Sequence, residues 1–231
     1  MTGRCAIIIG ANGGIGNAVA NALEQRPDFD TVYRIGRSGT PAIDLLDENS
    51  ISAAAQHFAA QSLTPDLIFI ATGILHHGNK GPEKGLRDLD SEWMMLNYRL
   101  NAIGPALVAK HFLPLMSKDK PTCFAALSAR VGSISDNKLG GWHSYRASKA
   151  ALNMLIRNLS IEWQRKNPQS VIVGLHPGTV ETPLSAPFRG NPAHERFTPK
   201  LAAAQLLTVL DDLKPDQSGQ LFGYDGKVIA P

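Results

Sequence analysis

The sequence has little that would direct it to a membrane, to nucleic acid or to a disulfide framework. Two cysteines among 231 residues are too few for such a framework, and Cys5 and Cys123 fall in predicted strands as expected free thiols. A net charge of +3 without a basic run predicts no nucleic-acid partner. No apolar run approaches membrane-spanning length, so we expect no membrane association. The first apolar residues run into a glycine turn rather than a signal-peptide cleavage site, and a cytoplasmic location is expected.

Strand-like and helix-like segments alternate along the chain, and no repeat or linker divides it. This alternation predicts an α/β fold of the Rossmann type, a doubly wound parallel sheet in a single domain over residues 1–231. Strands are expected near residues 4–9, 31–35, 42–44, 67–71, 122–127, 171–175 and 220–222, and helices near 14–25, 50–61, 91–116, 142–165 and 199–213.

A glycine-rich turn, GANGGIG, joins the first predicted strand to the first helix. Glycines there permit positive φ and close approach of the backbone to a pyrophosphate, while the helix N-terminus offers amide donors. No Lys-Ser or Lys-Thr pair follows, so the turn is not that of a nucleoside triphosphatase. The residues expected to contact a dinucleotide are Gly10, Asn12, Gly13, Gly14, Ile15 and Gly16.

Tyr145 and Lys149 lie four positions apart in a predicted helix and therefore share one helix face. A free tyrosine titrates near pKa ~10, and a neighbouring cation favours its phenolate. Such a pair can protonate a carbonyl oxygen.

The segment PGTVET, from Pro177 to Thr182, follows the predicted strand 171–175. Ligands of open parallel sheets bind beyond the carboxyl ends of the strands, so this segment is expected to border a ligand.

These motifs together resemble those of the short-chain dehydrogenase/reductase family, and the resemblance covers nearly the whole chain. GANGGIG, an Asp-Leu pair, ATG, NAIGP, YRASK and PGTVET occur in the order typical of that family. The longer string LGGWHSYRASKAALN, preceded by LSARVGSISDN, is most similar to the branch that contains carbonyl reductases and bacterial cell-contact signalling proteins.

The resemblance implies a reductase that transfers hydride from a nicotinamide to an aldehyde or ketone, with Tyr145 as proton donor. Lys149 would lower the pKa of Tyr145 and bond the nicotinamide ribose, and Asn101 would hold a water that links Lys149 to solvent. The resemblance also implies a homodimer or homotetramer through the helices 91–116 and 142–165, and a substrate-covering loop over residues 183–199. Phe188, His194 and Phe197 would give that loop apolar character.

Other positions carry cofactor contacts by the same resemblance. Asp44 and Leu45 would hold the adenine ring, and Ala71 and Gly73 would line the ribose. The asparagines usual before this turn are replaced by Ile70, Ala71 and Thr72. Contacts to the nicotinamide carboxamide are expected from Val180 and Thr182, and further contacts to the cofactor from Pro177 and Gly178.

The choice between NAD(H) and NADP(H) depends on the carboxyl end of the second strand. An acid there accepts from the ribose 2′-hydroxyl, whereas a cation binds the 2′-phosphate. Asp30 has the right spacing from Gly10 but precedes the strand, while Arg37 follows it. We therefore expect NADP(H) to be preferred, with NAD(H) as the alternative.

The catalytic serine is the weakest match. In the family it is the second serine of a pair, three residues before a glycine, and counting back from Gly132 places Ala129 there. Ser128 is the first candidate, through a shifted strand end, and Ser133 the second, from the following loop. The contact to the substrate oxygen could also be missing.

Two alternatives to a reductase remain at this stage. One is a dinucleotide-binding signalling or regulatory protein with weak or incidental catalysis. The other, a zinc hydrolase using His76, His77 and His143, is disfavoured because adjacent histidines point in different directions and no second motif accompanies them; we therefore expect no metal site.

Overall fold

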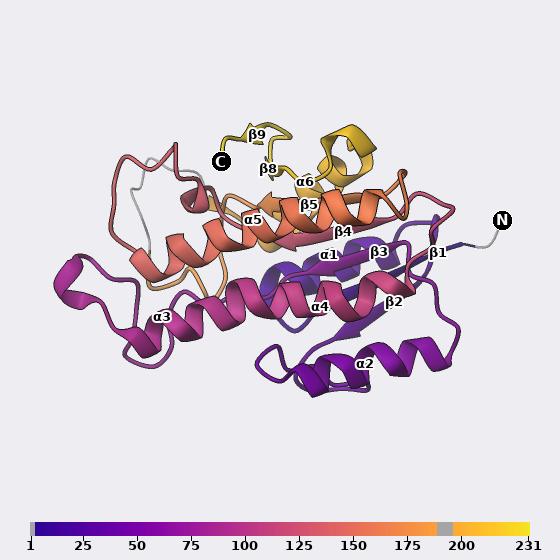
Figure 1. The fold of residues 1–231 in the computed structure, drawn as a ribbon, viewed down its shortest axis with the longest axis horizontal. Coiled ribbons are helices and arrows are strands. Elements are labelled where there is room, and N and C mark those ends of the chain that lie inside the picture. The colour runs from indigo at the N-terminus through magenta and orange to yellow at the C-terminus, as the bar shows by residue number, and fades with distance from the viewer. Residues whose placement is uncertain (1–2, 189–195) are drawn as a thin grey trace.

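A computed structural model describes residues 3–188 and 196–231. Its centre is a seven-stranded sheet in the order β2-β1-β3-β4-β5-β8-β9 (Figure 1). All neighbouring strands are parallel except β8 and β9, so the predicted doubly wound parallel sheet is confirmed with one antiparallel strand added at its edge. The strands are β1 (Arg4–Ile9), β2 (Phe29–Ile35), β3 (Leu67–Ile70), β4 (Cys123–Leu127), β5 (Val171–His176), β8 (Leu221–Gly223) and β9 (Val228–Ile229).

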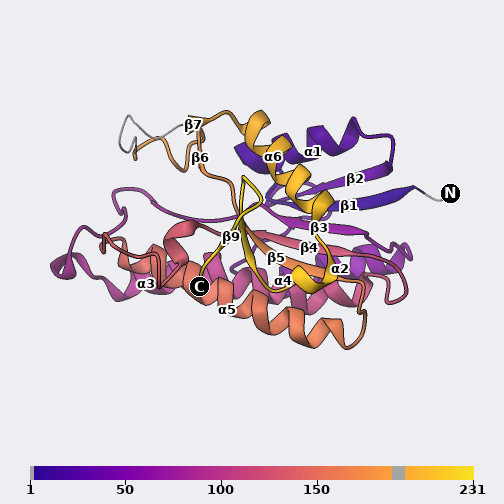
Figure 2. The ribbon, with the colours of Figure 1, turned by 90° about the horizontal axis from the view of Figure 1, so that it is seen from above.

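Helices cover both faces of the sheet (Figure 2). α1 (Gly14–Glu24) and α6 (Pro199–Asp212) pack on one face, and α2 (Glu48–Ala60), α4 (Gly104–Phe112) and α5 (His143–Gln164) pack on the other. Side chains alternate along each strand, so that Ile8 faces the α1 side and Ile7 faces the α5 side. Because both faces are buried, the central strands are apolar throughout.

The topology has a switch point at the carboxyl ends of β1 and β3, where open α/β sheets form a crevice. β2 pairs with one side of β1, and β3 pairs with the other side. Ile9 pairs with Ile70, so Gly10 and Ala71 leave the sheet at the same level. This reversal of strand order is the point at which open α/β sheets bind ligands.

Two predicted elements differ from the structure. The expected strand at 42–44 is reduced to a single bridge between Gly36 and Ala42, because Pro41 has no amide hydrogen for a ladder. The expected helix over 91–116 is divided into α3 (Ser91–Tyr98), a π-helix (Arg99–Ile103), α4 and a short 3₁₀ turn. Pro105 cannot donate to the carbonyl of Asn101, and the wider π turn accommodates this missing hydrogen bond.

The segment after β5 adds a small two-stranded sheet, β6 (Thr179–Val180) with β7 (Arg196–Phe197). β6 precedes the expected loop 183–199, and β7 lies within it. Residues 189–195 of that loop, including His194, lie outside the described residues. Within the described part of the chain, no helix combines the length and apolar character that crossing a membrane requires. Cys5 and Cys123 are free thiols.

Candidate functional site

The glycine turn forms a tightly packed cradle at the end of β1. Gly10 adopts φ +86°, and a Cβ built on it would lie 2.8 Å from Cγ2 of Thr72. A Cβ on Gly16 would collide with the carbonyl oxygen of Gly10. The Gly13 amide donates to that same oxygen at 3.0 Å. Gly10 and Gly16 therefore each depend on the absence of a side chain.

The N-terminus of α1 has no side-chain cap. Its N-cap residue, Gly13, offers no side-chain acceptor, and no acidic residue lies in the first turn. The amides at this end and the positive end of the helix dipole are therefore available to an anion.

The segment after β5 packs against this turn. A Cβ on Gly14 would lie 2.8 Å from Cγ2 of Thr182, and Ile15 packs beside the buried Val180 and Phe197. The structure thus brings the GANGGIG and PGTVET motifs together, although they are far apart in the sequence.

The crevice fits a dinucleotide. Thr72 Oγ1 is buried without a hydrogen-bond partner in the described part of the chain, beside the Gly10 turn. A ligand with polar groups would satisfy it. This atom, the glycine cradle and the uncapped helix are the features that a pyrophosphate and its riboses require.

Arg37 lies at the carboxyl end of β2, next to the glycine turn. Asn12 Nδ2 donates to Ser38 Oγ at 3.2 Å, so the turn and the residues after β2 are in contact. Arg37 is exposed and forms no ion pair with any described residue, whereas Arg34 is bound by Glu24 on α1 at 2.8 Å.

Asp30 lies at the opposite end of β2 from Arg37. Its carboxylate accepts from the Gly3 amide at 2.8 Å. Asp30 is therefore at the wrong end of the strand to reach a ribose bound at the turn.

The proposed adenine contacts lie in the connection from β2 to α2. Asp44 Oδ1 accepts from the Leu46 amide at 2.9 Å. Leu45 is buried, and a Cβ built on Gly104 would lie 2.8 Å from the Cβ of Leu45. Close packing against Gly104 fixes this connection on α4.

Asn101 is the centre of a buried hydrogen-bond network. Its Oδ1 accepts from the Ile74 amide at 2.8 Å, and its Nδ2 donates to the Ile74 carbonyl at 3.0 Å and to Ser148 Oγ at 3.1 Å. Asn97 Oδ1 also accepts from Nδ2 at 3.3 Å. Through Asn101, the π-helix is hydrogen-bonded both to α5 and to the segment that follows β3.

Lys149 lies in the same cluster. A Cβ on Gly73 would be 3.3 Å from Asn101 Oδ1 and 3.6 Å from Lys149 Nζ. The Lys149 ammonium donates to the carbonyl of Leu127 at 2.8 Å, at the end of β4. Three predicted residues from separate segments therefore converge at the carboxyl ends of β3 and β4.

Tyr145 lies one helical turn before Lys149, whose Nζ is 5.8 Å from the centre of the phenol ring. Burial raises the pKa of Tyr145 to about 12. Burial also lowers the pKa of Lys149 to about 7, because an ammonium is poorly solvated there. The direction of the pKa shift of Tyr145 is the reverse of the one expected from a neighbouring cation, because burial disfavours the charged phenolate. The phenol is protonated at neutral pH, which is the form that a proton donor requires.

The two candidate serines, Ser128 and Ser133, form hydrogen bonds with residues other than Tyr145. Ser128 lies on the same face of the strand as Ala126, toward α5, and its hydroxyl donates to Asn153 Oδ1 at 2.6 Å. Asn153 lies about two turns beyond Tyr145 on α5. The buried Ser133 accepts from the Asp136 amide at 3.1 Å. Among the described contacts, neither hydroxyl reaches Tyr145.

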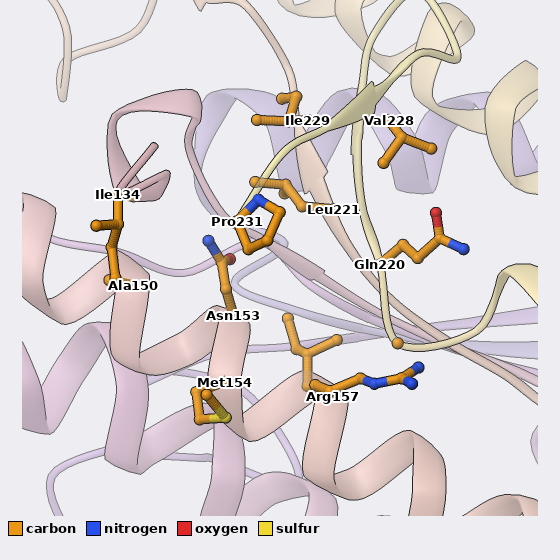
Figure 3. A pocket seen from close by; sticks show the side chains of 13 residues that line it. Ile134, Ala150, Asn153, Met154, Arg157, Gln220, Leu221, Val228, Ile229 and Pro231 are labelled. Atoms are coloured by element: carbon orange, nitrogen blue, oxygen red, sulfur yellow. The ribbon is translucent and has the colours of Figure 1, made fainter. Parts of the chain in front are cut away.

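Asn153 also lines a separate cavity of about 490 Å³ between α5 and the C-terminal strands. Figure 3 shows its side chain rising from α5 toward Pro231, with Ile134 and Ile229 nearby. Tyr145 and Lys149 are not among the residues that line this cavity.

Trp142, which the sequence motifs did not single out, is an aromatic side chain next to Tyr145. The Trp142 ring lies edge-on to Tyr145 at 6.3 Å between centres, and 5.6 Å from the Phe188 ring. His76 lies 5.8 Å from Phe188, and its Nε2 is 3.1 Å from the Pro183 carbonyl. Two glycines before Trp142 were the available signal, since they indicate a left-handed turn next to the helix that carries Tyr145.

No group of three or more His, Cys, Asp or Glu side chains in the described ranges could hold a metal ion. His77 begins a turn in which its amide donates to the Lys80 carbonyl at 2.9 Å.

Comparisons with known proteins find relatives in sequence and in structure. The 1-hydroxy-2-glutathionyl-2-methyl-3-butene dehydrogenase of Rhodococcus sp. (strain AD45) is 30% identical over 96% of this chain and 97% of its own. The C-signal of Myxococcus xanthus is 35% identical over 62% of this chain and 82% of its own. The NADPH-bound carbonyl reductase from chicken fatty liver superposes with a TM-score of 0.84 at 25% identity, covering both chains completely.

A family profile described as Enoyl-(Acyl carrier protein) reductase matches residues 28–212. Members of this family are oxidoreductases that bind nicotinamide dinucleotides and act on small molecules. The profile, the full-length relative and the crevice geometry together place the chain in the short-chain dehydrogenase/reductase family.

Proposed function

We propose that the protein reduces an aldehyde or ketone to an alcohol with NADPH, and that Tyr145 donates the proton. The observation that supports this most strongly is the convergence of Lys149, Asn101 and Gly73 beside a protonated Tyr145. The dinucleotide would bind beside this cluster, because Gly73 directly follows Thr72, which borders the Gly10 turn.

In the proposed reaction a carbonyl gains a hydride at carbon and a proton at oxygen. When bound, the reduced nicotinamide supplies the hydride with its two electrons. Tyr145 Oη–H gives its proton to the carbonyl oxygen as the C–O bond becomes single, and the phenolate that remains is stabilised by the ammonium of Lys149. Lys149 then returns a proton to the phenolate and regains one from solvent, through the water that Asn101 would hold. Asn101 also maintains the position of this helix through Ser148.

Arg37 supports NADP(H) over NAD(H), because a guanidinium that forms no ion pair with the described residues can bind a 2′-phosphate with paired hydrogen bonds. The chicken carbonyl reductase binds NADPH. Gly10 to Gly16 would hold the pyrophosphate, Asp44 and Leu45 the adenine, and Ala71 the ribose. Pro177, Gly178, Val180 and Thr182 would border the nicotinamide, and the loop 183–199 would cover the substrate.

A second candidate function is dinucleotide-dependent signalling with weak catalysis. Two observations favour it: Ala129 stands where the family places its serine, and the C-signal is among the relatives. Ser128 remains our proposed substrate contact, which requires its hydroxyl to leave Asn153.

We also propose a homodimer or homotetramer in the cytoplasm. α4 and α5 lie side by side (Figure 1), and Ile103, Met154 and Ile161 on this surface are exposed apolar side chains. Free thiols such as Cys5 are maintained in a reducing compartment. A light-scattering mass equal to one chain would refute the oligomer.

The experiment that separates the two functions combines NADPH binding with turnover. NADPH affinity is measured by fluorescence titration, and NADPH oxidation is followed by absorbance against aldehydes, ketones and quinones. Micromolar binding with turnover of at least one carbonyl is expected. Binding without any turnover would favour the signalling function.

A further inference from the structure

Glu83 is a buried acid that none of the sequence motifs contains. It lies in the connection between β3 and α3, and only 3% of its surface is exposed. Among the residues that the structure describes, no basic side chain forms an ion pair with it. A buried carboxylate without a cation must be stabilised by hydrogen-bond donors or by a helix dipole.

The partner of Glu83 is the N-terminus of α5. The Ser144 amide donates to both carboxylate oxygens, at 3.3 Å and 3.1 Å, and the Ser144 hydroxyl donates to one of them. The N-cap residue, Trp142, has no side-chain cap of its own, and the first turn contains no acid. Glu83 therefore supplies the cap of α5 from 61 positions away in the sequence.

Glu83 also holds the turn that leads into α5. Its backbone carbonyl accepts from the Trp142 amide at 2.6 Å. Gly140, Gly141 and Trp142 adopt successive left-handed conformations, with φ of 64°, 62° and 52°. A bulky residue rarely adopts positive φ, and it stays there only where its surroundings enforce it.

Tyr145 and the Trp142 ring depend on this turn. Trp142 lies edge-on to Tyr145 and also contacts Phe188, so its backbone conformation sets one wall beside the phenol. Tyr145 is the residue directly after Ser144. The main chain of Glu83 thus fixes Trp142, and its side chain fixes the turn of helix that carries Tyr145.

We propose that Glu83 is a positioning residue that aligns Trp142 and Tyr145 through the N-terminus of α5. Its catalytic consequence rests on the proposed reductase function, but the alignment does not. Glu83 lies outside the glycine turn and the Arg37 region, so its loss should affect turnover far more than NADPH affinity.

The test compares Glu83→Gln and Ser144→Ala with wild type in two measurements. Glu83→Gln keeps the side-chain length but loses the charge and one acceptor oxygen, whereas Ser144→Ala removes only the hydroxyl bond. The control is Glu92→Gln, an exposed acid in the first turn of α3, a helix already capped by Asp90. We expect kcat to fall about tenfold in Glu83→Gln and about threefold in Ser144→Ala. NADPH affinity should stay within twofold of wild type in both.

The second measurement is ¹⁹F NMR of protein labelled with 5-fluorotryptophan, which reports alignment without turnover. The chain has three tryptophans, and Trp142→Phe identifies the signal of interest. The Trp142 resonance should shift or broaden in Glu83→Gln and stay in place in Glu92→Gln, while those of the buried Trp93 and Trp163 stay in place in both.

An unmoved Trp142 resonance, or a kcat within twofold of wild type, would overturn the proposal. A parallel loss of kcat, NADPH affinity and thermal stability would reduce Glu83 to a structural role and would also overturn it. If Glu83→Gln does not fold, Ser144→Ala decides by the same criteria. If wild type reduces no carbonyl, the reductase function fails, and the NMR result alone decides the alignment.

Discussion

The N-termini of α1 and α5 both face the crevice side of the sheet, but they are completed in different ways. α1 has no cap and no acid in its first turn, so its amides remain available to an anion. The first turn of α5 receives the Glu83 carboxylate. One helix end is suited to bind a phosphate, and the other is closed by the protein itself so that Tyr145 is held in place.

This difference separates binding from catalysis. Changes at the α1 end should alter the affinity for NADPH with little effect on kcat. Changes at the α5 end should alter kcat with little effect on affinity. Variants at each end can therefore confirm or break the division.

The largest effect on NADPH binding is expected from Gly16→Ala at the α1 end. The added methyl group would meet the Gly10 carbonyl oxygen and lie 2.9 Å from Cβ of Ala71, so the cradle must open. We expect the Kd for NADPH to rise about a hundredfold in a fluorescence titration. Gly85→Ala is the control, since a Cβ there would meet no atom within 4 Å. Unchanged affinity in Gly16→Ala would mean that the cradle does not hold the pyrophosphate.

At the α5 end, pH should change kcat/KM through Lys149. The reaction requires protonated Lys149 and protonated Tyr145, whose pKa values are about 7 and about 12. Because the pKa of Lys149 is lowered, its charged form is present below pH 7 and is lost as the pH rises above it. We expect kcat/KM to be level below that pH and to fall about tenfold per pH unit above it.

The variant Lys149→Arg provides the comparison for this profile, since an arginine keeps its charge at all accessible pH values. Its activity will be lower, but the fall above pH 7 should disappear. The same fall in both proteins would assign it to another group.

A smaller effect is expected from Arg37→Ala. Losing a charge-assisted pair with the 2′-phosphate should weaken NADPH binding about tenfold and leave NADH binding unchanged. Arg87→Ala is the matched control, because 93% of the Arg87 side chain is exposed. An equal loss for both cofactors would refute the phosphate contact.

The smallest effect is expected from Ser128→Ala. The Ser128 hydroxyl already donates to Asn153, so it can donate to the substrate oxygen only after that hydrogen bond breaks. We expect kcat to fall about threefold, well below the hundredfold typical of a preorganised donor, because breaking the bond to Asn153 offsets most of the gain. A kcat equal to that of wild type would show that Ser128 makes no substrate contact, and a hundredfold fall in Ser133→Ala would move the assignment to the loop.

The α1 end could be predicted from the sequence because its determinants are local. Gly10, Gly13 and Gly16 follow one strand and precede one helix, and their spacing alone indicates a dinucleotide turn. The positions of most strands and helices along the chain could be predicted for the same reason, since each buried strand is a short apolar run.

The α5 end was only partly predictable because it is assembled from distant segments. Tyr145 and Lys149 are neighbours on one helix, but Glu83 has no local pattern that would link it to Ser144. The π-helix at Asn101 and the direction of the Ser128 hydroxyl also depend on contacts across the fold. The pKa of Tyr145 was expected to fall and instead rises, because burial cannot be read from the spacing of two side chains.

The central claim is that Tyr145 donates the proton in carbonyl reduction. Its most direct test is the amount of alcohol formed from an aldehyde and NADPH by wild type, by Tyr145→Phe and by Tyr33→Phe, a control on β2. The account predicts that Tyr145→Phe forms at least a hundredfold less alcohol per unit time while binding NADPH normally, and that Tyr33→Phe matches wild type. Alcohol formation by Tyr145→Phe at the wild-type rate would contradict it.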